Sequence, residues 1–178
     1  MSSIDFEECL SAISKNDPGR MRAALLRQPR VVHERDPEQR TLLLNVCFPM
    51  FAIANIEMVR MLLEHGADAS AVDQNGMNGL HGLALHHSKE FPQPIFEIGC
   101  LLKDRGLNID AVDMYGNTPL WRAVFESSAG PPFDAVVGLL RLGADINKKN
   151  KKGNSPMDMA RKIEGRAELA RTLQEWRR

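Results

Sequence analysis

Residues 113–121 read DMYGNTPLW, and this stretch determines the fold. Thr118 carries a hydroxyl of the kind preferred at helix N-termini, because its oxygen can accept a hydrogen bond from a backbone N–H of the first turn. Pro119 follows at the first helical position, where its missing N–H would have had no partner. Leu120 then begins an apolar face. The stretch therefore predicts a turn that leads directly into a short helix.

Related stretches recur along the chain, and each is followed by a second helical pattern that ends in paired leucines. The stretches begin at Asp36, Asp73, Asp113 and Asn150, so that successive starts are 37, 40 and 37 residues apart. The leucine pairs are Leu25–Leu26, Leu62–Leu63, Leu101–Leu102 and Leu139–Leu140. A glycine follows each of the last three pairs, where a left-handed residue closes a helix at little cost. Such a period indicates an array of similar units.

This combination resembles the ankyrin repeat, whose unit reads roughly D-x-x-G-x-T-P-L-H, then a short helix, then a helix ending in L-L-x-x-G-A-D. The family unit has 33 residues. Here all but one of the extra residues fall between the two helices of a unit, in FPMFAIAN, HHSKEFPQP and FESSAGPPF. The resemblance implies an all-α fold, an ankyrin-repeat solenoid of stacked helix-turn-helix units with hairpin-like fingers. We expect a single domain over 1–178, with units at about 1–35, 36–72, 73–112, 113–149 and 150–178.

The two terminal units are expected to act as caps. The first is divergent and predicts helices at about Ile4–Ser14 and Arg20–Arg27, separated by a turn. The last, from Met157 to Arg178, is charged and lacks a following Gly-Ala-Asp, as is typical of a cap that meets water. The second unit is the least regular, because Gln39 replaces the turn glycine.

The composition is that of a globular chain, with 43% apolar and 26% charged residues among 178. The sequence has no apolar run of about 18 residues, and its first ten residues do not form a secretory signal. Three cysteines without a CxxC pair favour a reducing compartment. We therefore expect a cytoplasmic, monomeric protein with no membrane partner.

The sequence contains no GxSxG, HExxH or phosphate-binding Gly-rich motif, so we expect no enzyme activity and no cofactor. The resemblance implies that His81 ties neighbouring loops together. His86 and His87 are adjacent, and adjacent side chains rarely point the same way. A metal site there would need further ligands such as Cys100 or Asp104, and none is expected. Five aspartates recur at equivalent positions of successive units, and we expect them to form hydrogen bonds in loops and fingers: Asp68, Asp73, Asp110, Asp113 and Asp145.

The zero net charge conceals an asymmetry. Residues 148–178 hold ten Lys or Arg against four Asp or Glu, whereas residues 1–147 hold 13 against 19, which gives +6 and −6. The densest run is KKNKK at 148–152, in the last finger. We interpret it as a solvated finger tip, with an acidic partner surface as the alternative. Nucleic acid is disfavoured, because the chain lacks both an overall basic charge and base-stacking aromatics.

Ankyrin arrays present finger tips and first helices along one concave face, so the variable positions of the opening motif form the expected contact set. By alignment these positions are Gln74, Asn75, Met77, Met114, Tyr115, Asn117, Trp121, Arg122, Lys151 and Lys152. Aromatics, Met and Arg are enriched at binding hot spots. Trp121 replaces the usual motif histidine, and it either anchors a partner or fills the space between adjacent fingers.

The inter-helix insertions supply a second candidate surface, because they carry five of the seven phenylalanines: Phe48, Phe51, Phe91, Phe125 and Phe133. Stacking of the units would bring the three loops into one row. The phenylalanines either form a partner surface or pack the loops against their own helices.

The functional hypothesis is a non-enzymatic protein-binding module that holds or occludes one partner protein. An inhibitor or immunity-type protein directed against a toxin or enzyme is a specific form of it. The alternative is an adaptor in a regulatory assembly, with the basic C-terminal end contacting an acidic partner or nucleic acid. The sequence does not identify the partner.

Overall fold

The computed structural model describes residues 3–49, 52–85, 90, 92–127 and 133–176. Within these residues the regular elements are all helical, which confirms the all-α prediction. The α-helices are α1 Ile4–Ser14, α2 Pro18–Arg27, α3 Leu42–Cys47, α4 Ile56–Glu64, α5 Gly79–Leu85, α6 Ile95–Asp104, α7 Pro119–Glu126, α8 Asp134–Leu142, α9 Pro156–Lys162 and α10 Ala167–Trp176. A 3-10 helix, η1, spans Pro29–His33.

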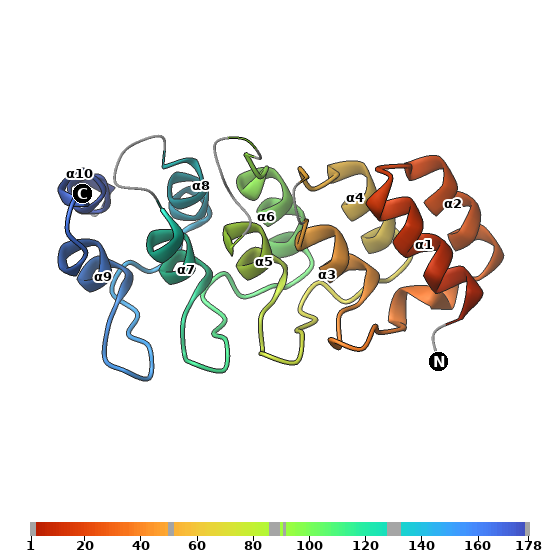
Figure 1. Ribbon diagram of the computed structural model, residues 1–178, viewed down its shortest axis with the longest axis horizontal. Coiled ribbons are helices and arrows are strands. Elements are labelled where there is room, and N and C mark those ends of the chain that lie inside the picture. The colour runs from red at the N-terminus through yellow and green to blue at the C-terminus, as the bar shows by residue number, and fades with distance from the viewer. Residues whose placement is uncertain (1–2, 50–51, 86–89, 91, 128–132, 177–178) are drawn as a thin grey trace.

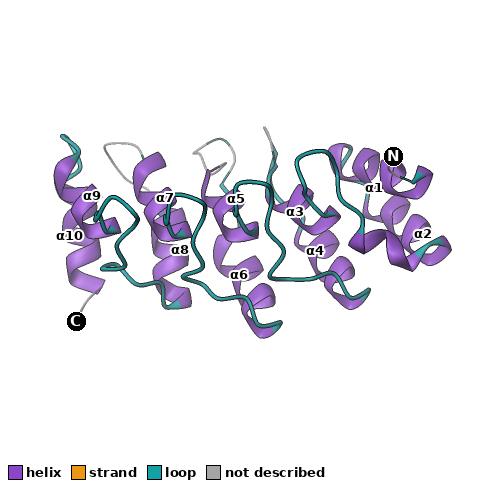
Figure 2. Ribbon diagram, turned by 90° about the horizontal axis from the view of Figure 1, so that it is seen from below, coloured by secondary structure: helices purple, strands orange, loops and turns teal. Residues whose placement is uncertain are grey.

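The helices form an elongated row of antiparallel pairs (Figure 1). The first helices of the pairs, α1, α3, α5, α7 and α9, pack in sequence against one another, and α2, α4, α6 and α8 form a second layer. Figure 2 shows the two layers and the loops that run between consecutive pairs. The fingers project from one edge of the row, next to the first-helix layer (Figure 1). Each pair therefore buries its apolar face mainly against its neighbours.

The helices begin where the sequence predicts N-caps. The Thr118 hydroxyl accepts a hydrogen bond from Trp121 N, and the Ser155 hydroxyl accepts one from Asp158 N. Proline occupies the first helical position in both α7 and α9. The Asn78 side chain caps α5 in the same way through the N–H of His81. The Thr41 hydroxyl likewise caps α3 by accepting from Leu44 N, so these local signals place four of the five first helices.

Each second helix with a leucine pair buries at least one leucine of it, and α4, α6 and α8 are followed by left-handed glycines. Leu62 and Leu139 are fully buried, whereas Leu26 of the first pair is 72% exposed because it lies on the outer side of the terminal unit. Gly143 follows α8 with a φ of 97°, a conformation in which a Cβ would be strained.

The N-terminal unit differs from its prediction in two details. Helix α2 begins at Pro18 rather than at about Arg20, because the Asp17 side chain accepts a hydrogen bond from Arg20 N and Pro18 suits the first helical position. The 3-10 helix η1 was not predicted. It buries Val31 and Val32 at the point where later units have a glycine-led loop.

The insertions lie between the helices of a pair, and part of each is described. Gln93 joins two of them, because its Oε1 accepts from Ala54 N at 3.0 Å and its Nε2 donates to Ala52 O at 2.8 Å. Phe48 and Phe133 are buried, as the packing alternative predicts. Phe51, Phe91, His86 and His87 lie outside the described residues.

Candidate protein-binding surface

Four fingers, each built around one side chain, connect consecutive units: finger 1 at 35–40, finger 2 at 72–77, finger 3 at 112–117 and finger 4 at 149–154. In finger 3, Asp113 Oδ1 accepts hydrogen bonds from Tyr115 N at 2.8 Å and Asn117 N at 2.9 Å. Asp73 and Asn150 organise fingers 2 and 4 in the same way. The prediction that repeat-phased aspartates shape the fingers is therefore confirmed.

The finger tips are joined to one another through their backbones. Gln74 N donates to Glu38 O at 3.1 Å, Met114 N to Asn75 O at 2.8 Å, and Lys151 N to Tyr115 O at 3.1 Å. The approach is close, since a Cβ on Gly116 would lie 2.8 Å from Lys151 N. These bonds hold corresponding side chains of successive fingers in a fixed row. We call this row, together with the first-helix layer beside it, the finger face.

Most residues of the predicted contact set are accessible on the finger face. Met114 and Tyr115 are 49% and 55% exposed, although both are large and apolar or aromatic. The remaining exposed members are Gln74, Lys151 and Lys152, and the half-buried members are Asn75, Trp121 and Arg122. The structure thus brings eight of the ten expected residues to this surface, and their role in binding stays a proposal.

Met77 and Asn117 require correction, because both are buried and point into the array. Met77 is 7% exposed. Asn117 donates from Nδ2 to Asp113 Oδ2 at 3.3 Å, and its Oδ1 accepts from Asn150 Nδ2 at 2.7 Å. The position closes the finger, so its side chain contacts the next unit rather than solvent. These two residues are structural.

Arg122 is committed to an internal ion pair. Its Nη2 lies 2.7 Å from Asp113 Oδ2, and the Asp113 side chain is fully buried. Burial by itself would raise the pKa of Asp113, but hydrogen bonds from Asn117 N, Arg122 and Tyr115 N outweigh it and lower the pKa. A buried pair of this kind is costly to break, because the remaining charge is left without compensation. A partner would meet only the outer edge of the guanidinium.

Trp121 lies on α7 and stacks on Phe125, with ring centroids 5.3 Å apart and an interplanar angle of 12°. Phe125 is 45% exposed, so the pair forms a rigid aromatic step on the finger face. Trp121 Nε1 is buried and has no hydrogen-bond partner within the described residues. This stack was not predicted from the sequence. The sequence places Phe125 in an insertion loop, whereas in the structure Phe125 lies on α7, one helical turn after Trp121.

His81 is fully buried and connects two units, which confirms its expected role. Its Nε2 donates to Asn117 O at 2.9 Å, and its Nδ1 accepts from Asn78 N at 3.2 Å. Because the carbonyl can only accept, the ring carries its proton on Nε2. Burial lowers the pKa of His81, so the neutral ring is the native form.

The lysine run divides into two kinds of residue. Lys148 is half-buried, and its Nζ donates to Asp110 O of the preceding unit at 2.7 Å. Lys149, Lys151 and Lys152 are exposed and have no ion pair or side-chain hydrogen bond within the described residues. The interpretation of a solvated tip therefore fits these three and is wrong for Lys148.

Cations also join units in places that sequence reasoning missed. Arg105 Nη1 donates to Leu63 O at 2.6 Å, and Lys103 Nζ donates to Leu142 O at 3.0 Å. Arg166 donates to two carbonyls at the end of α7. Each satisfies helix C-terminal carbonyls of a neighbouring unit. No local motif signals these links, since donor and acceptor are about 40 residues apart.

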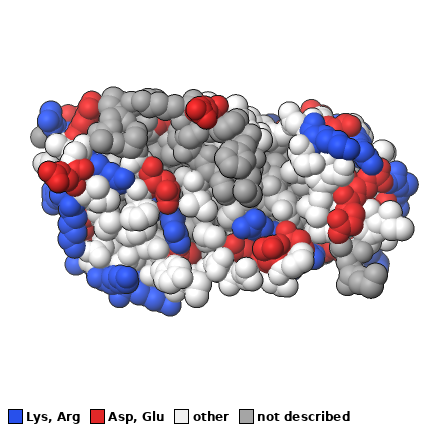
Figure 3. Space-filling model, viewed as in Figure 1, with Lys and Arg blue, Asp and Glu red and all other residues white. Residues whose placement is uncertain are grey.

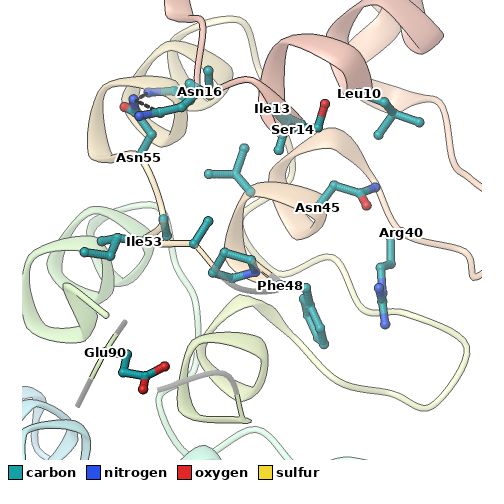
Figure 4. Close-up of a pocket in the computed structure, with 15 residues that line it drawn as sticks. Leu10, Ile13, Ser14, Asn16, Arg40, Asn45, Phe48, Ile53, Asn55 and Glu90 are labelled. Carbon is teal, nitrogen blue, oxygen red and sulfur yellow. Dashed lines mark hydrogen bonds between the residues drawn. The ribbon is translucent and has the colours of Figure 1, made fainter. Parts of the chain in front are cut away.

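A pocket of about 740 Å³ lies between α1, α3 and the first two insertions (Figure 4). Its wall includes Leu10, Ile13 and Ile53, and the Arg40 guanidinium lies 4.4 Å above the Phe48 ring. At its rim Asn55 Nδ2 donates to Asn16 Oδ1 at 2.7 Å. The lining that the structure describes is mainly apolar.

Within the described ranges, no group of three or more His, Cys, Asp or Glu side chains could hold a metal ion. A search of the same ranges finds no helix with the length and apolar character needed to cross a bilayer.

Comparison with known proteins identifies the family. Residues 49–150 match the family model of ankyrin repeats in three copies. A palmitoyltransferase, AKR1, of Lachancea kluyveri is 32% identical over 120 residues, or 67% of this chain and 15% of the relative. Ankyrin repeat protein OPG189 of Variola virus is 33% identical over 100 residues, or 56% and 16%.

A B-cell lymphoma 3 protein homolog of Mus musculus is 30% identical over 148 residues, or 66% of this chain and 32% of the relative. The chain thus spans less than a third of the length of each of these relatives. The similarity resides in the repeats themselves, so the chain belongs to the ankyrin repeat family, and its array is that of a protein–protein interaction module.

Proposed function

We propose that the chain is a non-enzymatic, cytoplasmic, monomeric module that holds or occludes one partner protein through the finger face. The observation that carries the proposal is the exposure of Met114 and Tyr115 on a finger fixed by backbone hydrogen bonds to both neighbours. Large apolar side chains on a fixed backbone bind at a lower entropic cost, because the backbone that carries them does not have to be ordered on binding. The Trp121–Phe125 step extends the same apolar area.

The proposed form of this activity is inhibition or immunity, in which the array covers a toxin or an enzyme. A module without chemistry of its own acts by occupying a partner surface, and a row of four fingers offers an extended one. The curated relatives include large proteins of different kinds, so they support binding without identifying the partner.

A second candidate function is an adaptor in a regulatory assembly. The exposed cations of finger 4 favour it, because they offer a second, chemically different contact at the basic end. An adaptor binds two partners at once, whereas an inhibitor forms a one-to-one complex that silences its partner. The stoichiometry of a purified complex distinguishes the two.

The experiment is affinity capture from native lysate with wild type and with Tyr115→Ala, followed by titration calorimetry with the captured protein. We expect Tyr115→Ala to cost on the order of 2 kcal/mol in binding with an unchanged melting temperature. The matched control is Leu26→Ala, which removes a large side chain that is 72% exposed, against 55% for Tyr115, from the outer side of α2. If Tyr115→Ala and Leu26→Ala both bind the partner with the affinity of the wild type, the interface lies elsewhere than on the finger face.

Trp121→Ala separates binding from packing. If Trp121 anchors a partner, its loss weakens binding more than folding. If it is a spacer between fingers, its loss leaves a cavity and lowers the free energy of unfolding by about 3 kcal/mol. Thermal melts and calorimetry on the same variant decide between these outcomes.

A further inference from the structure

Fingers 3 and 4 carry opposite chemistries at matched positions. The residue before the organising Asp or Asn and the two residues after it are exposed in both fingers. In finger 3 these residues are apolar or aromatic: Val112, Met114 and Tyr115. In finger 4 they are all cations: Lys149, Lys151 and Lys152.

Charge also varies along the row. Finger 1 presents the opposite charges of Arg35 and Glu38, finger 2 presents Gln74 and Asn75, and fingers 3 and 4 follow with their apolar and cationic sets. Figure 3 shows acidic and basic atoms side by side around finger 1 and a group of basic atoms over finger 4. The inter-finger backbone bonds fix the order and spacing of these side chains.

The cations of finger 4 form no ion pair within the described residues, although Lys149 is close enough to Asp158 to help lower the pKa of that carboxyl. Nearby Asp158 is occupied, because its carboxylate accepts from Ser155 N at 2.9 Å and from Ser155 Oγ at 2.8 Å. Three neighbouring cations on one tip repel one another and create a local positive potential. A carboxylate-bearing partner relieves this repulsion, and charge complementarity of this kind also fixes the register of a complex.

We infer that the finger face binds an acidic segment of a partner protein, in which an apolar side chain seats on finger 3 and the adjacent carboxylates reach the cations of finger 4. The inference rests on the proposed function and names the chemistry of its partner. A membrane or a nucleic acid fits less well, because a uniformly anionic surface that follows the row would meet the apolar side chains of finger 3 and the mixed charges of finger 1. A protein segment can change its charge from one finger to the next.

The test is selection of a displayed library of random peptides on the immobilised full chain. We expect enriched peptides to carry Asp and Glu next to an apolar residue, and their affinity to fall with salt. Replacing Lys149, Lys151 and Lys152 together by Glu should weaken the selected peptides at least about tenfold in fluorescence anisotropy. The same variant, used as the target, should select basic peptides instead.

The matched control is Lys15→Glu with Arg30→Glu and Arg60→Glu, which changes the net charge equally but lies on the other half of the array. This control should stay within about twofold of wild type, since distant exposed charges are screened. All six positions are exposed, so circular dichroism melts should show folded variants.

Three results would overturn the inference. Selected peptides that are not acidic, or that bind the finger 4 variant as well as wild type, would remove the carboxylate requirement while leaving binding through Tyr115 intact. Tighter binding to phosphatidylserine vesicles or single-stranded RNA than to the acidic peptides would assign the lysines to those ligands. A selection that enriches no peptide would also refute the inference. In that case, capture of a partner whose binding depends on Tyr115 would show that the proposed function survives.

Discussion

Replacing His81 tests how strongly two units of the array are latched together. The side chain is fully buried and makes hydrogen bonds to Asn78 and to the Asn117 carbonyl of the next unit. His81→Ala would leave that carbonyl unpaired, at a cost of about 1–3 kcal/mol, and would open a cavity that costs roughly 2 kcal/mol more. We therefore expect the free energy of unfolding to fall by about 3–5 kcal/mol in urea titrations followed by circular dichroism. The control is His65→Ala, at a half-buried ring with one local bond.

The same histidine makes stability depend on pH in a defined direction. Its pKa in the folded protein lies below the ordinary value of 6.5, because burial disfavours the charged ring. Between the two values the unfolded chain binds more protons, so the contribution is complete above pH 6.5 and is lost as pH falls below it. The loss is at most about 1.4 kcal/mol per pH unit.

His81→Gln isolates this contribution, because the carboxylates titrate equally in both proteins. The wild type should lose more stability than the variant as pH falls below the ordinary value, by no more than about 1 kcal/mol over the first pH unit, because the unfolded ring is only half protonated at its own pKa. Parallel pH profiles for the two proteins would refute the assignment of a neutral, buried ring. A His81→Ala variant as stable as the His65→Ala control would show that the hydrogen bonds of His81 do not hold the two units together.

Three further predictions concern single residues. Gln39 has a left-handed φ of 63° where other fingers have glycine, so Gln39→Gly should raise the free energy of unfolding by about 0.5–1 kcal/mol in urea titrations. Gly82→Ala should lower the melting temperature sharply, because its Cβ would lie 2.4 Å from a Phe48 ring carbon, and a normal melt would show that the ring can move aside. Burial raises the pKa of Cys47 to about 12, so iodoacetamide should label half-buried Cys100 and spare Cys47 in mass spectra of the native protein.

The elements that the sequence predicts correctly depend on signals within a few residues of one another. Thr118 and Ser155 cap their own helices, and Gly143 closes the helix that precedes it. Such signals are local, because the donor and the acceptor share one turn of chain. The repeat period then extends each assignment to the matching position of the next unit.

The assignments that failed concern contacts between units. Met77 and Asn117 align with variable, solvent-facing positions, but the inward packing of each finger against its neighbour buries them. Lys148 reaches the carbonyl of Asp110, 38 residues away in the preceding unit. Alignment gives the position of a residue within its unit, but it does not show whether the neighbouring unit buries that residue.

The missing side chain at Gly82 restricts how the array could be rearranged. Gly82 stands where the next unit has Arg122, so Asp73 has no counterpart of that ion pair and instead faces Arg40 of the preceding unit, at 3.9 Å. The space left by the glycine is filled by Phe48, also from the preceding unit. These units are therefore not interchangeable modules. Shuffling, duplicating or deleting the 73–112 unit would separate residues that depend on one another. A side chain at position 82 would need both a smaller residue at position 48 and a shift of the Cys47 carbonyl, which would lie 2.5 Å from the new Cβ.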